Sequence, residues 1–534
     1  MRNKNFYLVI GLIFVLGVIL RVVFSPPINF ETDSFSVLLS AKNIAEAGRY
    51  LIPPVRLTDG SGYQPFPGWA VGCPLTLAVF FKLLGYSEAL ARLLTILAAS
   101  AVIPIIGLLG NRLYGEKSGI IAAIFVALNP FLICINSRIL TINFSFCFFT
   151  ISIALLLLSA LSSDKTEFIS AQVIFSSVKR WVLLLVSFLF LGFTLGTRDD
   201  YAMFVFVFII ILAAIVKASY KQAAENRRIS LLKLFLLAAA LTFIGYLPNI
   251  YFNFVNYGRF ITSSHYEYGG RLSLEYFLHG PHTGLGLPGW IVMLLAVFIY
   301  VFPIMGIFLL NFKSKANLLL VAMIFLIILP VILIAGAYFT ASSGGAPRYI
   351  LPVIPFVLLS AGAVFATGGG PVRYFLKSIF LTCLIFWNVI LFYPPVVLFK
   401  AYPKIAYLTQ YSPWYNLNNF LNYPHPVKTM LAWVKSNTAA DAVILSDYDS
   451  YHYFFYAQRD IASRDNLMEV KKILTSRPVF FIEDHQTLKD PVSFSAWAQE
   501  LSKYSISMEQ RYSLPLFSPL KGQVQLKIYE LINK

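Results

Sequence analysis

The sequence predicts a polytopic α-helical membrane protein, with about eleven transmembrane helices and a small C-terminal α/β domain on the outer face. Of its 534 residues, 58% are hydrophobic and only 13% are charged, and the mean hydropathy is +0.72. Soluble proteins carry about 25% charged residues. Long, nearly uncharged stretches of the length of a bilayer-spanning helix recur from Phe6 to Val397. These observations exclude a soluble globular enzyme and a disordered chain.

The net charge of +17 indicates membrane topology rather than nucleic-acid binding. Residues 1–397 hold 27 Lys and Arg against 13 Asp and Glu, whereas residues 398–534 hold 15 against 12. The apolar part therefore carries 14 of the 17 excess positive charges. Lys and Arg collect in the cytoplasmic loops of membrane proteins, so we predict no nucleic-acid partner.

The N-terminal segment and the cysteines are both consistent with a membrane-embedded chain. Residues 1–25 contain a basic start and a long apolar run without a small-x-small cleavage site, which favours a retained first span over a signal peptide. The cysteines lie far apart in apolar segments, without the spacing of a metal site, and we interpret them as packing residues. They are Cys73, Cys134, Cys147 and Cys383.

Hydrophobic runs and basic residues together predict the topology. The predicted spans lie near residues 6–24, 90–110, 118–134, 142–161, 180–196, 201–216, 230–250, 288–310, 317–338, 347–366 and 376–397. Whether the hydrophobic run 70–84 also crosses the membrane is ambiguous from its length. The positions of basic residues decide between the two topologies, because Lys and Arg favour the cytoplasmic side. If this run does not cross, the basic loops share the N-terminal side, which we predict to be cytoplasmic. These loops carry Arg112, Lys117, Lys165, Lys179, Arg180, Lys217, Lys221, Arg227, Arg228, Lys233, Lys313, Lys315, Arg373 and Lys377. We therefore interpret 70–84 as a re-entrant or interfacial helix.

This topology divides the chain into a transmembrane domain, residues 1–397, and an extracytoplasmic domain, residues 398–534. The outer loops 25–89 and 251–287 are long, and the first contains an amphipathic stretch, Ser34–Gly48, suited to the membrane interface. In the C-terminal domain, short buried strands are predicted at 442–446 and 478–482, with helices near 426–437, 465–475 and 493–504.

Two carboxylates, Glu31 and Asp33, follow the first span and lie close to the outer membrane surface. Asp33 is suited to be the N-cap of the helix that begins at residue 34. A partly desolvated carboxylate at this position is also suited to be a general base that deprotonates an acceptor hydroxyl. The two roles are compatible, so both remain open from position alone.

Three arginines are exceptions to the positive-inside pattern, because they fall on the outer side of the predicted topology. Arg138 lies between the third and fourth spans, Arg198 between the fifth and sixth, and Arg348 at the start of the tenth. They could pair with neighbouring acids, as Arg198 with Asp199 or Asp200, or snorkel to the interface. A guanidinium also binds phosphate bidentately, and three on the face that carries the carboxylates favour a lipid-linked phosphate site.

Further candidates for contact with a sugar or an acceptor lie in or beside the outer loops. They are Tyr63, His265, Glu267 and Tyr349. The pairs His265/Glu267 and His279/His282 have spacings that allow a metal site, but the sequence supplies no third strong ligand. Loop hydrogen bonding and interfacial anchoring are the alternative roles. No phosphate-binding glycine loop, nucleophile elbow or zinc-protease motif is present.

The order of these motifs resembles the GT-C superfamily of membrane glycosyltransferases, in the branch of protein O-mannosyltransferases and the aminoarabinose transferase. The resemblance covers roughly residues 1–400 and rests on several short matches. They are Asp33-Ser-Phe-Ser-Val-Leu-Leu-Ser-Ala41, Pro65-Phe-Pro-Gly-Trp69, Leu109-Gly-Asn-Arg-Leu-Tyr-Gly115, Gly196-Thr-Arg198 and Arg348-Tyr-Ile-Leu-Pro-Val-Ile-Pro355.

The resemblance implies an inverting glycosyltransferase that uses a polyprenyl-phosphate sugar donor and a glycan, lipid or protein acceptor. Asp33 matches the family's base, with Glu31 in reserve, and the arginines would hold the donor phosphate. At two positions this sequence departs from the family's pattern, and the family's roles do not apply there. Asn143 stands where the family often has an acid, which puts a metal held by paired acids in doubt, and the family's lysine near Gln64–Pro67 is absent. We therefore expect no required cofactor and do not expect lipid A modification.

Two other functions remain open from the sequence. A lipid-linked glycan transporter or flippase would favour internal repeats and polar residues at mid-membrane. A lipid-glycan ligase or polymerase would also use outer arginines, but would not require the first-loop carboxylate. In each case we expect an integral protein of a bacterial inner membrane, with a cytoplasmic N-terminus and an extracytoplasmic C-terminal domain.

Overall fold

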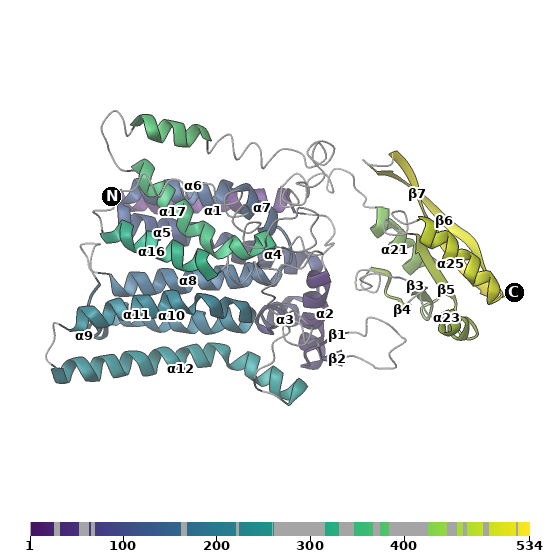
Figure 1. Cartoon of the computed structure of the whole chain (residues 1–534), viewed down its shortest axis with the longest axis horizontal. Helices are drawn as coiled ribbons and strands as arrows, with labels where there is room; N and C mark the ends of the chain where they lie inside the picture. Colours follow the sequence, from purple (N-terminus) through teal and green to yellow (C-terminus); the bar gives the residue numbers. More distant parts are fainter. Residues whose placement is uncertain are drawn as a thin grey trace. The chain divides into compact units, whose positions relative to one another are not determined.

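A computed structural model of the chain divides into two compact units, which we describe separately (Figure 1). Unit 1 comprises residues 1–25 and 67–417, and unit 2 comprises residues 26–66 and 418–534. The structure describes residues 2–25, 32–52, 64–65, 70–161, 168–220, 224–258, 260, 315–330, 346–366, 374–383, 426–445, 456–462, 467–483, 491–518 and 522–533.

Unit 1 is a helical bundle whose helices lie side by side in Figure 1. Its elements are α1 (Arg2–Val23), α3 (Gly72–Leu84), α4 (Glu88–Ser100), α5 (Val102–Tyr114), α6 (Glu116–Leu128), α7 (Pro130–Asn136), α8 (Thr141–Ala160), α9 (Ala171–Ser176), α10 (Val178–Thr197), η2 (Asp199–Phe204), α11 (Val205–Ser219), α12 (Ala224–Tyr257), α16 (Lys315–Pro330), η5 (Ala346–Val353) and α17 (Ile354–Ala366). A shared apolar core joins α1 to helices as distant in sequence as α17.

The predicted membrane protein is confirmed in its coarse features. Among the described residues, five helices are long and apolar enough to cross a membrane, and α6 and α7 form a sixth candidate with a 57° bend. Helices α11, α16 and α17 are apolar but shorter. The predicted span 288–310, and the later parts of 317–338 and 376–397, lie outside the described residues. The count of eleven therefore stays a prediction.

Helix α3 agrees with the prediction that the run 70–84 does not cross the membrane. Its 13 residues extend for about 20 Å, shorter than the roughly 30 Å of a hydrocarbon core. The chain before and after it also meets at one end of the bundle. Arg92 of α4 donates a hydrogen bond from Nη1 to Ser25 Oγ, 2.9 Å away, just beyond α1. The segment between these residues therefore starts and finishes on the same side.

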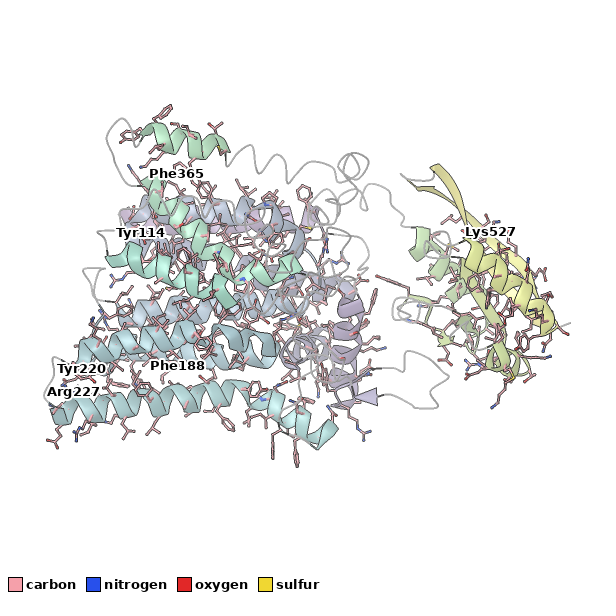
Figure 2. The ribbon with its side chains drawn as sticks, viewed as in Figure 1. Tyr114, Phe188, Tyr220, Arg227, Phe365 and Lys527 are labelled. Carbon is pink, nitrogen blue, oxygen red and sulfur yellow. The ribbon has the colours of Figure 1, made fainter. Side chains whose placement is uncertain are left out.

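The bundle has two ends that differ in charge. At the end we call the basic end, α5, α8 and α11 finish and α6, α10 and α12 begin. Arg180 donates there to the carbonyls of Ser159 and Leu161 (3.2 and 2.8 Å), and Arg227 lies over the Tyr220 ring at 4.6 Å (Figure 2). At the opposite end, α8 begins beside Arg198, the residue after α10, and we call this the Arg198 end.

Helices α10 and α12 cross at glycines and then separate toward the Arg198 end. A Cβ on Gly192 would overlap the Thr242 carbonyl oxygen and lie 2.7 Å from Gly245 Cα, so only hydrogen allows this approach. One turn further, a Cβ on Gly196 would meet no atom of α12 closer than 3.6 Å. Close crossings at small residues are typical of membrane helices. The space that opens beyond the crossing forms part of the site described below.

Unit 2 contains α2 (Thr32–Ala47), a small hairpin of β1 (Leu51–Ile52) and β2 (Gln64–Pro65), and a C-terminal α/β domain. In that domain the strand order is β4-β3-β5-β7-β6, with β4, β3 and β5 parallel and β7 and β6 antiparallel. These strands are β3 (Val443–Leu445), β4 (Asp460–Ala462), β5 (Val479–Glu483), β6 (Ile506–Ser518) and β7 (Gly522–Asn533). The accompanying helices are α21 (Pro426–Asn437), α23 (Leu467–Leu474) and α25 (Pro491–Lys503).

The small C-terminal α/β domain is thereby confirmed, with both strands and all three helices that the sequence predicts. The sequence did not predict β4 or the long β6–β7 hairpin. Helix α2 joins this unit through a T-shaped contact between Phe35 and Tyr456, whose ring centroids lie 5.7 Å apart. The predicted amphipathic stretch is thus a helix, but it begins at Thr32. Asp33 therefore lies in the first turn and not at the N-cap, where a carboxylate still interacts favourably with the helix dipole.

Candidate functional site

The turn between α7 and α8 positions Arg138 at the Arg198 end of the bundle. Arg138 follows α7 by two residues, and its backbone N–H donates to the Ile135 carbonyl at 3.1 Å. Its side chain is half-buried, and Nη2 contacts Cys134 Sγ at 3.4 Å. The turn is short and hydrogen-bonded, so the direction of α7 determines where this guanidinium lies.

Asn143 holds this turn together from the first turn of α8. Its side chain is fully buried, and Nδ2 donates to the carbonyls of Ile135 and Arg138 at 3.1 and 2.8 Å. Among the described residues, Asn143 Oδ1 and both polar atoms of the buried Asn136 have no hydrogen-bond partner. An ionised aspartate has no donor, so a carboxylate at this position could make neither of these hydrogen bonds.

Arg198 lies between three helices at this end. It is the extended residue that follows α10, only 3% of it is exposed, and Nη1 donates to Thr141 Oγ1 at 3.3 Å. The preceding residue, Thr197, packs against Gly72 at the start of α3, where a Cβ would lie 2.6 Å from Thr197 Oγ1. Arg198 thus places a buried positive charge beside the first residues of α3 and α8. Whether Asp199 or Asp200 pairs with it lies outside the described side chains.

An apolar cavity of about 160 Å³ borders Thr197, the residue before Arg198. It lies where α10 and α12 have separated, and its lining includes Phe148, Phe193, Thr197 and Gly72. Its polar groups are satisfied within the protein: Thr197 donates to the Phe193 carbonyl at 2.7 Å, and Asn249 Oδ1 accepts from Val71 N at 3.0 Å. The cavity therefore suits an apolar group, and it borders the residue before the buried guanidinium.

The other predicted site residues fall in several parts of the chain. Arg348 and Tyr349 lie on η5, which contacts α8, but their side chains are not described. Asp33 lies on α2 in unit 2, again without a described side chain. The remaining candidates lie outside the described residues: Glu31, Tyr63, His265 and Glu267. Within unit 1, the structure brings Arg138 and Arg198 to the start of α8, through Asn143 and Thr141 respectively.

Asn143 does not supply the acid that a metal held by paired carboxylates would need at this position. Among the residues that the structure describes, no three His, Cys, Asp or Glu side chains form a cluster that could bind a metal ion. At the position where the resembling family often has an acid, the Asn143 amide nitrogen is committed to two carbonyls. We therefore derive no step of the chemistry through a metal.

The sequence did not predict the roles of Thr141, Asn249 or Arg21. Thr141 and Asn249 contact groups far away in the sequence, so no local pattern marks them. Arg21 could have been recognised from the sequence, because an arginine near the end of an otherwise apolar span needs a hydrogen-bonding partner. The break inside the predicted span 118–134 was also readable from Asn129-Pro130, since proline has no N–H and disfavours helix at the preceding residue.

Comparison with solved structures identifies the fold. Crystal structures of ArnT from Cupriavidus metallidurans, bound to undecaprenyl phosphate and in the apo state, superpose with TM-scores of 0.64 and 0.60. Both are 12% identical in sequence to this chain and are matched over 99% of this chain and 98% of theirs. The chain has the GT-C fold.

The archaeal oligosaccharyltransferase AglB from Archaeoglobus fulgidus, solved with an inhibitory peptide and a dolichol-phosphate, is also similar. Its TM-score is 0.52 at 12% identity, over 98% of this chain and 74% of AglB. No protein-family model and no curated protein matches the sequence. The resemblance stated from sequence motifs is thus confirmed in the fold, at an identity too low for sequence matching to detect.

Proposed function

We propose that this protein is an inverting glycosyltransferase that moves a sugar from a polyprenyl-phosphate donor to a hydroxyl acceptor at the outer face of a bacterial inner membrane. The observation that carries the proposal is Arg198, a buried guanidinium whose preceding residue, Thr197, lines an apolar cavity in a GT-C fold. Such a site suits a ligand with an anionic head and an apolar chain. The similar structures of ArnT and AglB contain undecaprenyl phosphate and a dolichol-phosphate, which supports this donor class.

The proposed reaction needs a base and a held leaving group. Asp33 accepts the proton of the acceptor hydroxyl, with Glu31 in reserve, while the hydroxyl oxygen forms a bond to the anomeric carbon. The bond from that carbon to the phosphate oxygen breaks on the opposite face, and polyprenyl phosphate leaves with the bonding electrons. General bases contribute about 10²- to 10⁴-fold to such steps.

In this proposal the arginines neutralise the charge that develops on the phosphate. Arg198 and Arg138 lie at the start of α8, and Arg348 belongs to η5, which contacts the same helix. Guanidinium groups form strong hydrogen bonds to phosphate oxygens, and such preorganised groups stabilise a leaving phosphate. The cavity next to Thr197 receives the first isoprene units of the donor. This arrangement does not require a divalent metal.

The acceptor in this proposal is a glycan, a lipid or a protein that presents a hydroxyl group. Tyr63, His265, Glu267 and Tyr349 are proposed to contact the acceptor or the sugar. The extracytoplasmic domain, residues 398–534, and the loop 251–287 are proposed to shape the acceptor site. The bilayer supplies the donor, and no nucleic acid takes part.

The test is transfer by the purified chain in lipid nanodiscs, supplied with a polyprenyl-phosphate sugar and envelope extracts as acceptor. Mass spectrometry identifies the product, and release of polyprenyl phosphate gives the rate. We expect Asp33→Asn to lower the rate by at least about 100-fold, because it removes the base. Glu46→Gln is the matched control, since Glu46 is an exposed carboxylate on the same helix. Full activity of D33N would refute the base assignment, and donor movement without bond cleavage would favour the flippase.

A further inference from the structure

The last turn of α1 contains a fully buried arginine whose hydrogen bonds all go to backbone carbonyls of the bundle. Arg21 Nη1 donates to the Gly17 carbonyl at 2.9 Å and to the Ala127 carbonyl at 3.4 Å, and Nη2 donates to the Val126 carbonyl at 3.3 Å. Gly17 provides the space that the Arg21 side chain occupies. A Cβ at this position would lie 3.3 Å from Arg21 Nη1 and would overlap Ile103.

The two carbonyls of α6 need these donors because of Pro130. In a continuous α-helix the N–H of residue 130 would bond to the Val126 carbonyl, and that of residue 131 to the Ala127 carbonyl. Proline has no N–H, and Asn129 is extended with ψ 119°, so the chain bends by 57° between α6 and α7. In a membrane interior an unsatisfied carbonyl costs several kcal/mol. Arg21 therefore supplies from α1 the hydrogen bonds that the bend removes from α6.

A second tether joins α1 to the other end of α7. Ser25 Oγ donates to the Ser137 carbonyl at 3.0 Å and accepts from Arg92 Nη1 at 2.9 Å. Arg92 is itself held by Glu88, with Nη2 and Oε1 2.7 Å apart. Ser137 is the residue before Arg138, so α1 contacts the chain on both sides of α7.

We propose that Arg21 and Ser25 are positioning residues, which fix the bend between α6 and α7 and so hold Arg138 in place for the donor phosphate. The role of Arg138 rests on the proposed function, whereas the geometry of the bend does not. Fixing this short helix matters because α7 has only seven residues and leads directly into the turn that carries the guanidinium.

The first experiment is a double-variant cycle with R21M and P130A in the full-length protein, measuring Tm and the KM and kcat for a polyprenyl-phosphate sugar. R21M leaves the Val126 carbonyl without a donor, and P130A restores an N–H that can bond to it in a straight helix. We expect R21M to raise the KM for the donor about tenfold and to lower the Tm. The R21M/P130A variant should recover the Tm but not the KM, because a straightened helix misplaces Arg138. Recovery of both would overturn the proposal.

Two further variants keep the test decisive if R21M does not fold. S25A removes one hydrogen bond at the end of α1, and we expect a KM about threefold higher with kcat and Tm unchanged. R180M is the matched control, because Arg180 also donates to helix-end carbonyls but at the basic end. We expect the KM of R180M to stay at the wild-type value. An unchanged KM in S25A, or an equal rise in R180M, would contradict the proposal.

A readout independent of activity separates this proposal from the proposed function. In a C383S background, which removes the exposed native thiol, R138C introduces a thiol whose reaction with a water-soluble maleimide can be timed. We expect R21M and S25A each to change this rate at least threefold, and R180M to leave it unchanged. That result with an inactive wild type would refute only the proposed function. Unchanged rates in an active enzyme would refute only the positioning role.

Discussion

The two ends of the helical bundle use arginine differently. At the basic end, Arg180 caps the end of α8 through backbone carbonyls, and the half-buried Arg227 lies over the exposed Tyr220 ring. At the Arg198 end, the guanidinium is almost fully buried and donates to the Thr141 hydroxyl, and the preceding residue, Thr197, lines an apolar cavity. A charge that still reaches water costs little, whereas a charge buried at a membrane edge needs a reason.

Burial thus distinguishes Arg198 from the arginines at the basic end. Lys and Arg at the basic end are numerous and report which side of the membrane a loop occupies. Arg138 and Arg198 are fewer and are set into the packed ends of α7, α8 and α10. If the two ends differ in function, equivalent substitutions at each end should have unequal effects.

Replacing the buried arginine should affect catalysis far more than replacing its counterpart at the basic end. We expect Arg198→Gln to lower kcat/KM for the donor about 100-fold, because one preorganised charged donor contributes about that much. Arg180→Gln should stay within about threefold, since it removes a helix cap in a half-buried position. Steady-state kinetics on both variants decide the matter. Equal losses would show that the two ends do not differ in function.

The glycine crossing between the two ends should tolerate a methyl group at only one of two positions. We expect Gly192→Ala to destabilise the protein by about 2 kcal/mol, because overpacking forces α10 and α12 apart. Gly196→Ala lies one turn closer to the Arg198 end, where the helices have separated, and should leave the Tm unchanged. Thermal unfolding in detergent measures both variants. A stable G192A variant would contradict the close crossing.

The turn at the Arg198 end should depend on an amide rather than an acid. Asn143→Asp removes the two hydrogen bonds to the Ile135 and Arg138 carbonyls and places a carboxylate beside those oxygens. We expect about tenfold lower kcat/KM for the donor, with the main effect on KM, because the position of Arg138 changes. Asn437→Asp is the control, since that exposed side chain also donates to a carbonyl but lies in the C-terminal domain. An active N143D would show that the turn does not position the phosphate site.

Much of the helical fold was predictable because hydrophobic runs have the length of the membrane. The runs at 6–24, 142–161 and 180–196 correspond closely to α1, α8 and α10. The sidedness of the 70–84 run also followed from basic residues, and the bond between Arg92 and Ser25 agrees with it. In the C-terminal domain, β3 and β5 were predictable as buried apolar runs. Strands β6 and β7 were missed, although Val524-Gln-Leu-Lys-Ile528 alternates apolar and polar residues as a half-buried strand does.

The site was less predictable because its geometry depends on contacts between distant residues. Arg138, Arg198 and Arg348 were selected because they break the positive-inside pattern, which is a property of the whole sequence. The contact of Arg198 with Thr141 and the cavity beside Thr197 depend on how α10 meets α8 and α12. The proposed role of Arg21 depends on a bend in a distant helix. The two carbonyls that it contacts there belong to residues 105 and 106 positions further along the chain. Such pairings require the packed structure.

The smallest expected effect concerns divalent metal, and it tests whether the arginines alone carry the charge of the leaving phosphate. We expect transfer to stay within about twofold after EDTA treatment and dialysis, because guanidinium groups can stabilise the leaving group without a Lewis acid. The amide at position 143 supports this expectation, since its nitrogen donates to carbonyls where a metal-binding acid would repel them. Rates with and without added Mg²⁺ or Mn²⁺ provide the measurement. A loss of activity that either ion restores would show that the Arg198 end also uses a metal, held by residues outside those described.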